Sequence, residues 1–442
     1  MSPVRRRAAM ALVAVERGRR TLAAELELAR RDLDDERDRG LLMELAVGTC
    51  RWQAECDAVL SQFSARPLAA IDEFSKACLR VALYQLRHLD RVPPHAVVHA
   101  AVDAAKALVN DRAGGFVNGV LRAYLRAPQS ATLPPRPDES ASRRQHIDYL
   151  NITLSHPRWL VARWLDRYGF EMTEAWCQFN NTPPEPCVRA LNPTIDHTAA
   201  WLVGQGVAAA PSPLVPDMAR LLPGTLGQLP PELREQLAVQ DDGSALVADA
   251  VNARPDDRVL DVCAAPGGKA VRLWRAMERR GLLIAGDVRP ARVRLLRQTL
   301  RAAGVPPRVV AHDGLQGLAV EPVFDRILVD APCSGLGTLR RDPDLKWSSS
   351  LEVLPTLADA QLQLLTQAAR VLAPEGLLTY ATCSSEPEEN EGVIARFLSA
   401  HPEFTFVPWT GAAAAQDGAL RTVPPRDRTD AFFAMRLRRG PA

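Results

Sequence analysis

The sequence feature that most constrains the fold is the stretch Asp261-Val-Cys-Ala-Ala-Pro-Gly-Gly-Lys269. An apolar run, residues 258–262, leads into it, and an amphipathic segment, residues 270–280, follows it. This order predicts a strand, a tight glycine turn and a helix, which is the opening unit of a doubly wound α/β domain. Gly267 and Gly268 have no side chain and so allow the backbone to approach a ligand closely. The N-terminus of the helix also offers unpaired N–H groups there.

The spacing within this turn excludes two common ligand classes. A phosphate-binding P-loop requires Gly-x-x-x-x-Gly-Lys-Ser/Thr, but Cys263 stands at the first glycine position and Ala270 follows the lysine. A dinucleotide-binding turn requires Gly-x-Gly-x-x-Gly, which is absent. A nucleotide-like ligand without a polyphosphate is left, and S-adenosylmethionine fits that description. For this stretch alone, a plain strand-to-helix turn is the alternative.

Two later strands also end in polar residues. The first, residues 324–330, ends in Asp330 and is followed by Cys333, and the second, residues 377–382, is followed by Cys383. In a parallel sheet, ligands gather at the carboxyl ends of the strands. We therefore expect these side chains and Cys263 to lie at one rim, where two cysteines beside a methyl-donor site indicate chemistry rather than packing.

Three motifs together resemble the signatures of RNA cytosine-5 methyltransferases: Asp261 to Lys269, Asp330-Ala-Pro-Cys-Ser-Gly335 and Ala381-Thr-Cys-Ser384. The chain resembles the bacterial ribosomal RNA small subunit methyltransferase B family nearly end to end. The resemblance implies a multidomain protein. Its expected parts are an all-α NusB-like RNA-binding domain (1–127), a small α+β RNA-recognition-like subdomain (145–240) and an α/β Rossmann-like methyltransferase domain (241–442).

Hydrophobic periodicity supports this division. Helical patterns cover residues 40–63, 74–89 and 95–109, and a last helix of the first domain opens at Gly114. A Pro- and Ser-rich linker follows at 127–144. Two amphipathic helices are expected at 156–170 and 171–180. From residue 241 strands and helices alternate as in a parallel sheet, and the tail, residues 430–438, alternates as a closing strand that pairs antiparallel.

Composition limits the remaining possibilities. The 54 Lys and Arg against 52 Asp and Glu give a net charge of only +2, so affinity for nucleic acid must come from local patches. No apolar run approaches the roughly 20 residues of a membrane span. The eight cysteines form no Cys-x-x-Cys, so the sequence lacks the paired cysteines of a structural zinc site. We expect a cytoplasmic monomer with no metal and no membrane contact.

Two basic clusters are candidates for RNA contact. Arg5, Arg6 and Arg7 open the chain, with further arginines at 17, 19 and 20. The second cluster, residues 340–347, places Arg340, Arg341 and Lys346 beside a tryptophan, a composition that suits phosphate contact and ring packing. The alternatives are a solvated helix face for the first cluster and a charged surface loop for the second.

The resemblance also assigns the binding site for S-adenosylmethionine. Asp287 ends the second strand about twenty residues past the glycine turn, where a carboxylate meets a ribose hydroxyl in this architecture. Asp313 ends the third strand and is placed to reach the adenine; for either aspartate alone, a helix N-cap is the alternative. The implied donor-binding residues are Cys263, Ala264, Ala265, Pro266, Gly267, Gly268, Lys269, Asp287, Asp313 and Asp330.

The acceptor chemistry requires a cysteine. Carbon 5 of cytosine is a poor nucleophile, but a thiolate that adds to carbon 6 turns carbon 5 into an enamine-like nucleophile. By local chemistry Cys333 and Cys383 are nearly equivalent. The resemblance implies that Cys383 attacks and that Cys333 assists product release. Asp330 would bond to the cytosine edge, and Lys269 would orient Asp330 or the base.

The expected function is therefore S-adenosylmethionine-dependent methylation of carbon 5 of a cytosine in 16S ribosomal RNA. The same chemistry on transfer RNA is one alternative, because the catalytic motifs do not distinguish the two substrates. A non-enzymatic RNA-binding, antitermination-like factor with a degenerate catalytic domain is another, but the intact Cys333, Cys383 and Asp330 argue against it.

Overall fold

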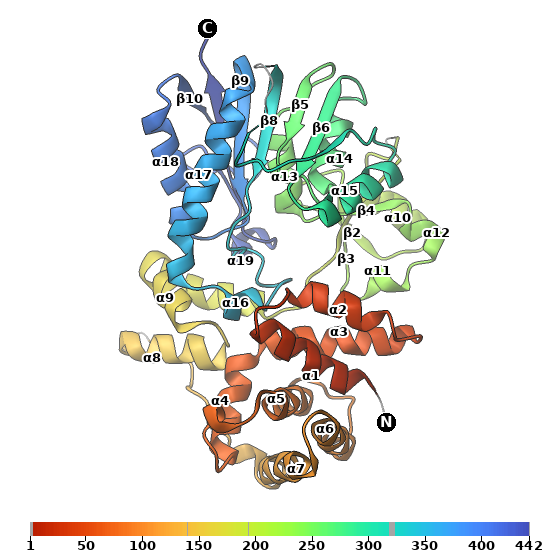
Figure 1. Ribbon diagram of the computed structural model, residues 1–442, viewed down its shortest axis with the longest axis vertical. Coiled ribbons are helices and arrows are strands. Elements are labelled where there is room, and N and C mark those ends of the chain that lie inside the picture. Colours follow the sequence, from red (N-terminus) through yellow and green to blue (C-terminus); the bar gives the residue numbers. More distant parts are fainter. Residues whose placement is uncertain (1–2, 139, 193, 318–322, 442) are drawn as a thin grey trace. The chain divides into compact units, whose positions relative to one another are not determined.

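The computed structural model describes residues 3–138, 140–192, 194–317 and 323–441. The chain forms two compact units. Unit 1 comprises Met1–Thr182 and Leu339–Ser350, and unit 2 comprises Pro183–Thr338 and Leu351–Ala442. Most helices and many strands of both units are labelled in Figure 1. This division differs from the three expected domains, because residues 145–182 and 339–350 belong to the N-terminal unit.

The first part of unit 1 is helical, as predicted. Its helices are α1 (Pro3–Glu16), α2 (Leu22–Arg30), α3 (Glu36–Arg51), α4 (Gln53–Phe63), α5 (Glu73–His88), α6 (Pro94–Leu108) and α7 (Asp111–Arg126), with a 3-10 turn η1 (Leu68–Ala70). Thr21, Asp35, Asp72 and Asn110 cap four of them by accepting a backbone N–H. Their apolar faces meet in one buried core. The expected single helix 40–63 divides at Trp52, whose backbone leaves the helical region.

The second part of unit 1 contains η2 (Pro128–Ser130), α8 (Arg143–Asp148), the π-helical η3 (Tyr149–Thr153) and α9 (Arg158–Asn180). Ser142 and Gln145 form a capping box that starts α8. Gly169 interrupts α9 with φ 75° and ψ 175°, a conformation that favours glycine. The two helices expected at 156–170 and 171–180 are thus the two halves of α9. The segment 339–350 adds α16 (Leu345–Ser348) to this unit.

Unit 2 begins with a small antiparallel sheet of order β2-β3-β1-β4. Its elements are β1 (Cys187–Ala190), α10 (Thr198–Gly204), β2 (Ala209–Pro211), β3 (Ala219–Leu221), α11 (Thr225–Gln228), α12 (Pro231–Arg234) and β4 (Leu237–Val239). Val188 of β1 and Leu202 of α10 share its small core. This is the expected α+β subdomain.

The large sheet of unit 2 has the order β10-β12-β9-β8-β5-β6-β7, with β11 paired to β12. Figure 1 labels β10, β9, β8, β5 and β6 in this sheet. Its strands are β5 (Arg258–Asp261), β6 (Leu282–Asp287), β7 (Val309–Ala311), β8 (Phe324–Asp330), β9 (Leu372–Thr382), β10 (Phe404–Val407), β11 (Leu420–Arg421) and β12 (Phe433–Arg439). Strands β5 to β9 pair in parallel, whereas β12 pairs antiparallel with β9. The predicted parallel sheet with an antiparallel closing strand is confirmed.

Helices cover both faces of this sheet. They are α13 (Asp242–Ala250), α14 (Gly268–Ala276), α15 (Pro290–Ala302), α17 (Leu354–Arg370) and α18 (Glu391–Ala400), with short turns η4 (Leu351–Val353), η5 (Pro387–Glu389) and α19 (Pro424–Asp427). Val259 and Leu328 pack in one core with α13 and α14, and Leu260 and Ile327 pack in a second core with α17 and α18. Because β6 and β8 both pair in parallel with β5, the polar residues that follow these three strands emerge at the same edge of the sheet.

Candidate active site

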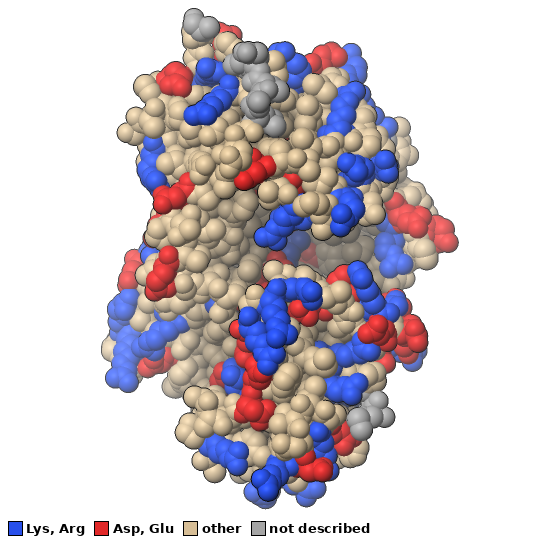
Figure 2. All heavy atoms as spheres, in the orientation of Figure 1, with Lys and Arg blue, Asp and Glu red and all other residues tan. Residues whose placement is uncertain are grey.

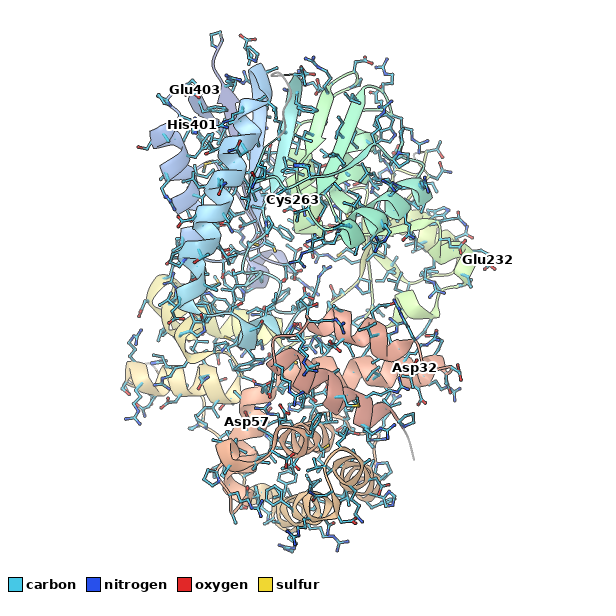
Figure 3. The ribbon with its side chains drawn as sticks, in the orientation of Figure 1. Asp32, Asp57, Glu232, Cys263, His401 and Glu403 are labelled. Carbon is cyan, nitrogen blue, oxygen red and sulfur yellow. The ribbon has the colours of Figure 1, made fainter. Side chains whose placement is uncertain are left out.

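The glycine turn connects β5 to α14 and presents Cys263 at the carboxyl end of β5 (Figure 3). Gly267 has φ +117°, and a Cβ there would lie 3.0 Å from Leu296. A larger residue would therefore be strained at Gly267. At Gly268 a Cβ would meet nothing closer than 3.9 Å, so the start of α14 is open to a ligand.

Asp261 lies at the base of this turn and is fully buried. Burial, followed by the charge of Asp330, raises the pKa of Asp261 to about 8. Burial also raises the pKa of the Cys263 thiol, with Asp261 adding to the effect. Cys263 is therefore a neutral thiol that belongs to the wall of the turn.

Asp287 and Asp313 lie at the ends of the next two strands, as predicted. Asp287 is 4% exposed and forms an ion pair of 3.2 Å with Arg292, which also donates 2.7 Å to the carbonyl of Ala265. Arg292 thereby ties Asp287 to the glycine turn. Each aspartate side chain also accepts a hydrogen bond from the backbone N–H two residues ahead: Asp287 from Arg289 and Asp313 from Leu315. Both aspartates therefore stabilise the loops that follow their strands.

Cys333 and Cys383 are brought together by the parallel pairing of β8 and β9. Their Sγ atoms lie 3.3 Å apart. The hydrogen bond with Cys333, together with burial, raises the pKa of the Cys383 thiol well above its ordinary value. Lys269 acts in the opposite direction, since its positive charge favours the Cys383 thiolate.

Lys269 and Asp330 form the charged part of the site. Lys269 Nζ donates a hydrogen bond of 2.7 Å to Asp330 Oδ2, and the two side chains are 13% and 25% exposed. Burial alone would lower the pKa of Lys269, but the Asp330 carboxylate raises it. The ammonium also lies 5.3 Å from the ring centroid of Phe432. Asp330 therefore keeps a fixed orientation while part of its carboxylate stays accessible.

The first basic cluster is partly engaged within unit 1. Arg5 donates to the Gln85 side chain, and Arg7 donates to the Ala29 carbonyl and to Asp32, which Figure 3 labels. Arg6 is exposed. A hollow of about 490 Å³ is lined by a larger set of these arginines, namely Arg6, Arg7, Arg17, Arg19 and Arg20. Basic and acidic side chains are interspersed over unit 1 in Figure 2.

Burial of Lys346 and Arg340 in the second basic cluster contradicts their predicted RNA contact, and it equally contradicts the alternative of a charged surface loop. Lys346 is completely buried, and its Nζ donates to the carbonyls of Arg51 and Ser155 and to Asn181 Oδ1 at 2.9–3.2 Å. Arg340 is 8% exposed and stacks over the Phe179 ring. These cations are used inside unit 1, so they are not available to phosphates.

Arg341, the remaining member of that cluster, is half-buried. Trp347 donates from Nε1 to the Cys50 carbonyl at 2.7 Å, and Asp344 accepts the backbone N–H of Leu22. The segment 339–350 therefore packs inside unit 1 and forms hydrogen bonds with its helices. Its composition of charges with an indole is typical of surface contact, and the sequence carries no signal of its burial.

One group near the thiols was not predicted from the sequence. Glu389 on η5 is fully buried and accepts hydrogen bonds from Ser334 and Ser384, the residues that follow the two cysteines. A glutamate six positions past a strand-end cysteine carries no sequence signal for such a role. Its contribution depends on how β8 and β9 pair.

The described residues contain neither a cluster of side chains that could bind a metal ion nor a helix that could span a membrane. Among them, no group of three or more His, Cys, Asp or Glu side chains has an arrangement that could hold a metal ion. Nor does any helix in these parts of the chain combine the length and apolar character needed to cross a membrane.

Comparison with known families and solved structures agrees with this architecture. The 16S rRNA methyltransferase RsmB/F family matches residues 248–438, the NusB family matches 2–126, and the ferredoxin-like domain of RsmF/B-like methyltransferases matches 156–224. The solved structure of PH0851 covers 98% of this chain with a TM-score of 0.80 at 24% identity, which supports the fold. A methyltransferase homologue from Pyrococcus horikoshii, 28% identical, covers 68% of the chain with a TM-score of 0.57.

Curated relatives extend the match to nearly the whole chain. The probable ribosomal RNA small subunit methyltransferase B of Bacillus subtilis is 32% identical over 424 residues, which is 92% of each protein. The ribosomal RNA small subunit methyltransferase B of Sodalis glossinidius is 36% identical over 406 residues, covering 91% of this chain and 90% of the relative. The NusB-like helices, the Rossmann-like sheet and these matches lead to one assignment: the chain belongs to the RsmB/F family of 16S ribosomal RNA methyltransferases.

Proposed function

We propose that this chain methylates carbon 5 of a cytosine in 16S ribosomal RNA, with S-adenosylmethionine as methyl donor and a covalent adduct on Cys383. The observation that carries the proposal is the pair of thiols 3.3 Å apart after β8 and β9, together with the ion pair of Lys269 and Asp330, whose charges both act on Cys383. A methyltransferase acting on nitrogen or oxygen has no need of two adjacent thiols.

The residues present fit the donor. The open N-terminus of α14 at Gly268 offers backbone N–H donors to a nucleoside. Hydrogen bonds from its hydroxyl groups would be accepted by the carboxylates of Asp287, Asp313 and Asp330. The turn from Cys263 to Lys269 would surround the nucleoside. When bound, S-adenosylmethionine supplies an electrophilic methyl group. Arg292 keeps Asp287 against this turn and so preserves the shape of the site.

Cys383 would act first, by addition of its thiolate to carbon 6 of the cytosine. Carbon 5 then becomes nucleophilic and takes the methyl group. The raised pKa of Cys383 means that the free protein holds the thiol, so its proton must pass to a general base when the substrate binds. The ammonium of Lys269 favours that ionisation, and Asp330, oriented by Lys269, would bond to the cytosine edge.

Cys333 would complete the cycle. After methyl transfer, carbon 5 carries both the new methyl group and its original proton. A general base removes that proton, its C–H electron pair re-forms the carbon 5–carbon 6 double bond, and the Cys383–carbon 6 bond breaks so that Cys383 leaves as a thiolate. A second thiol 3.3 Å from the first is close enough to assist this release.

The RNA substrate has physical requirements of its own. A stacked and paired cytosine cannot expose carbon 6 to a thiolate, so the target base must lie in a loop or be extruded. The arginines that line the hollow in unit 1 suit phosphate contact. The choice of 16S ribosomal RNA is supported by the family and by the names of the relatives.

The test is transfer of a labelled methyl group to unmodified RNA, followed by nucleoside analysis. We expect label in 5-methylcytidine of 16S ribosomal RNA with the wild type, and none with Cys383→Ala. Label in transfer RNA alone would move the substrate and keep the chemistry. Label in any nucleoside other than 5-methylcytidine, or none at all, would refute the proposal.

A further inference from the structure

Glu389 occupies a position that links the two cysteine-bearing loops of unit 2. Its Oε1 atom accepts a hydrogen bond of 2.8 Å from the backbone N–H of Ser334 and one of 2.9 Å from Gln361 Nε2. Its Oε2 atom accepts hydrogen bonds from the hydroxyls of Ser334 and Ser384. The carboxyl group is fully buried and has four donors around it.

Both serines are direct chain neighbours of the thiols. Ser334 follows Cys333, and Ser384 follows Cys383. Their hydroxyl oxygens also lie 3.2 Å from each other. The carboxyl group of Glu389 therefore joins the same two loops as the thiol pair does, one residue further along each chain.

The surroundings hold Glu389 itself in place. The Tyr380 hydroxyl donates to its backbone carbonyl, and the same hydroxyl lies 3.1 Å from Gln361 Oε1. The neighbouring Asn390 donates from Nδ2 to the Ser384 carbonyl at 3.0 Å and accepts from the Thr382 hydroxyl. A fully satisfied buried network of this kind is rigid, whereas one lost partner leaves the others unsatisfied.

From this geometry we propose that Glu389 is the positioning residue that holds the Cys333 and Cys383 thiols side by side. It touches neither sulfur and acts through the serine that follows each cysteine. Its catalytic consequence rests on the function proposed above, but the spacing of the thiols does not. The two parts can therefore be tested separately.

The thiol spacing can be measured without RNA. Phenylarsine oxide condenses with two neighbouring thiols: one As–S bond forms to each sulfur, and the oxygen leaves as one water with the two thiol protons. Such two-point binding is lost when the geometry prevents simultaneous engagement. Five of the other six cysteines are buried. The variants Cys333→Ser and Cys383→Ser are controls: each should lose tight binding if the arsenical binds to this pair of thiols. Wild type that fails to bind the arsenical would overturn the proposal.

The decisive comparison is between Glu389→Ala and Glu389→Gln. Glutamine retains the shape and can keep four contacts, because serine hydroxyls accept as well as donate. We expect Glu389→Gln to bind the arsenical within about threefold of wild type, and Glu389→Ala to bind at least tenfold more weakly. Glu388→Ala, a half-buried neighbour on the same turn, is the matched control and should bind like wild type. A folded Glu389→Ala with wild-type affinity would overturn the proposal.

A second set of variants covers the case in which Glu389→Ala does not fold. Ser334→Ala with Ser384→Ala removes the hydroxyl contacts from the other side and leaves the glutamate in place. We expect the double substitution to weaken the arsenical complex and each single substitution to have a smaller effect. Wild-type affinity in the folded double variant would contradict the positioning role.

Methyl transfer provides the catalytic readout. Misplacement of a reacting group by about 1 Å costs on the order of 10²-fold in rate. The rate of single-turnover methyl transfer at saturating RNA should therefore fall by about that factor in Glu389→Ala, while its RNA affinity stays unchanged. The rate of Glu389→Gln should stay close to that of the wild type. If the wild type transfers no methyl group while the arsenical results hold, the proposed function fails and the positioning role stands. If the wild type is active but Glu389→Ala keeps both its arsenical affinity and its rate, only the positioning role fails.

Discussion

Lys269 Nζ lies 2.7 Å from Asp330 Oδ2, and this pair connects the glycine turn after β5 to the end of β8. Lys269 is one of only four lysines in the chain. An ammonium is a compact charge, whereas a guanidinium would need more space and a planar partner. The pair holds Asp330 in one orientation and places a positive charge where it favours the Cys383 thiolate.

Substitution Lys269→Met should therefore reduce catalysis more than stability. Loss of one preorganised donor typically costs about 10²–10³-fold in rate, and we expect a decrease of that size in single-turnover methyl transfer. Arg294→Ala on the exposed side of α15 is the control and should retain full activity. A Lys269→Met protein with a wild-type rate would show that the ammonium has no part in the reaction.

The reactivity of Cys383 should increase with pH and should depend on Cys333. The Cys333 hydrogen bond is the largest cause that raises the pKa of Cys383, and burial is the second. Since only the thiolate reacts, alkylation of Cys383 by iodoacetamide should accelerate about tenfold per pH unit below that pKa.

In Cys333→Ala the same alkylation profile should shift to lower pH, by roughly one unit or more. The measurement is the alkylation rate by peptide mass spectrometry from pH 6 to 10, which requires no RNA. A profile that is unchanged, or that moves to higher pH, would contradict the assigned coupling between the two thiols.

Asp261 should make the folded state less stable as pH rises. Its folded pKa of about 8 lies above the unfolded value of about 3.9. The folded protein thus holds a proton that the unfolded chain releases, so this stabilising contribution is complete below about pH 4 and is lost as pH rises through about 8.

Asp261→Asn removes this dependence. Between pH 5 and pH 8 the melting temperature of unit 2 should fall by roughly 5 °C more in the wild type than in Asp261→Asn. Asp256→Asn makes the same chemical change at an exposed position and should follow the wild type. Equal pH dependence in wild type and Asp261→Asn would show that Asp261 is not protonated in the folded state.

Much of unit 2 is predictable from the sequence because strand and helix periods differ and each strand of the parallel core is short. The rim that collects Asp330, Cys333 and Cys383 follows from strand ends alone. The start of β9 at Leu372 does not, because Pro374 and Gly376 interrupt the apolar pattern on which the prediction of 377–382 depended. Pairing with β8 extends the strand through this interruption.

The segment 339–350 shows a different limit. Its cations and tryptophan predict RNA contact, yet Lys346 is buried among three oxygen acceptors within unit 1. A single lysine cannot reveal from sequence whether its acceptors are phosphates or carbonyls. That depends on carbonyls from residues about 190 and 295 positions away along the chain, which only the tertiary structure brings together.

Lys346→Ala should consequently destabilise unit 1. The substitution leaves two buried carbonyls and one amide oxygen without their donor, at a cost of about 3 kcal/mol. We expect a lower melting temperature for the helical unit, measured by circular dichroism. Arg6→Ala, at an exposed position of α1, should melt like the wild type. Unchanged stability with weakened RNA binding in Lys346→Ala would return this lysine to the RNA-contacting role.

The most direct measurement is the fate of the protein–RNA adduct in Cys333→Ala. After incubation with S-adenosylmethionine and unmodified 16S ribosomal RNA, denaturing gels should show protein covalently joined to RNA through a methylated cytosine. The adduct should be absent when Cys383→Ala is added to the same protein. An adduct that persists without Cys383, or a Cys333→Ala protein that turns over at the wild-type rate with no adduct, would contradict the assignment of the two cysteines.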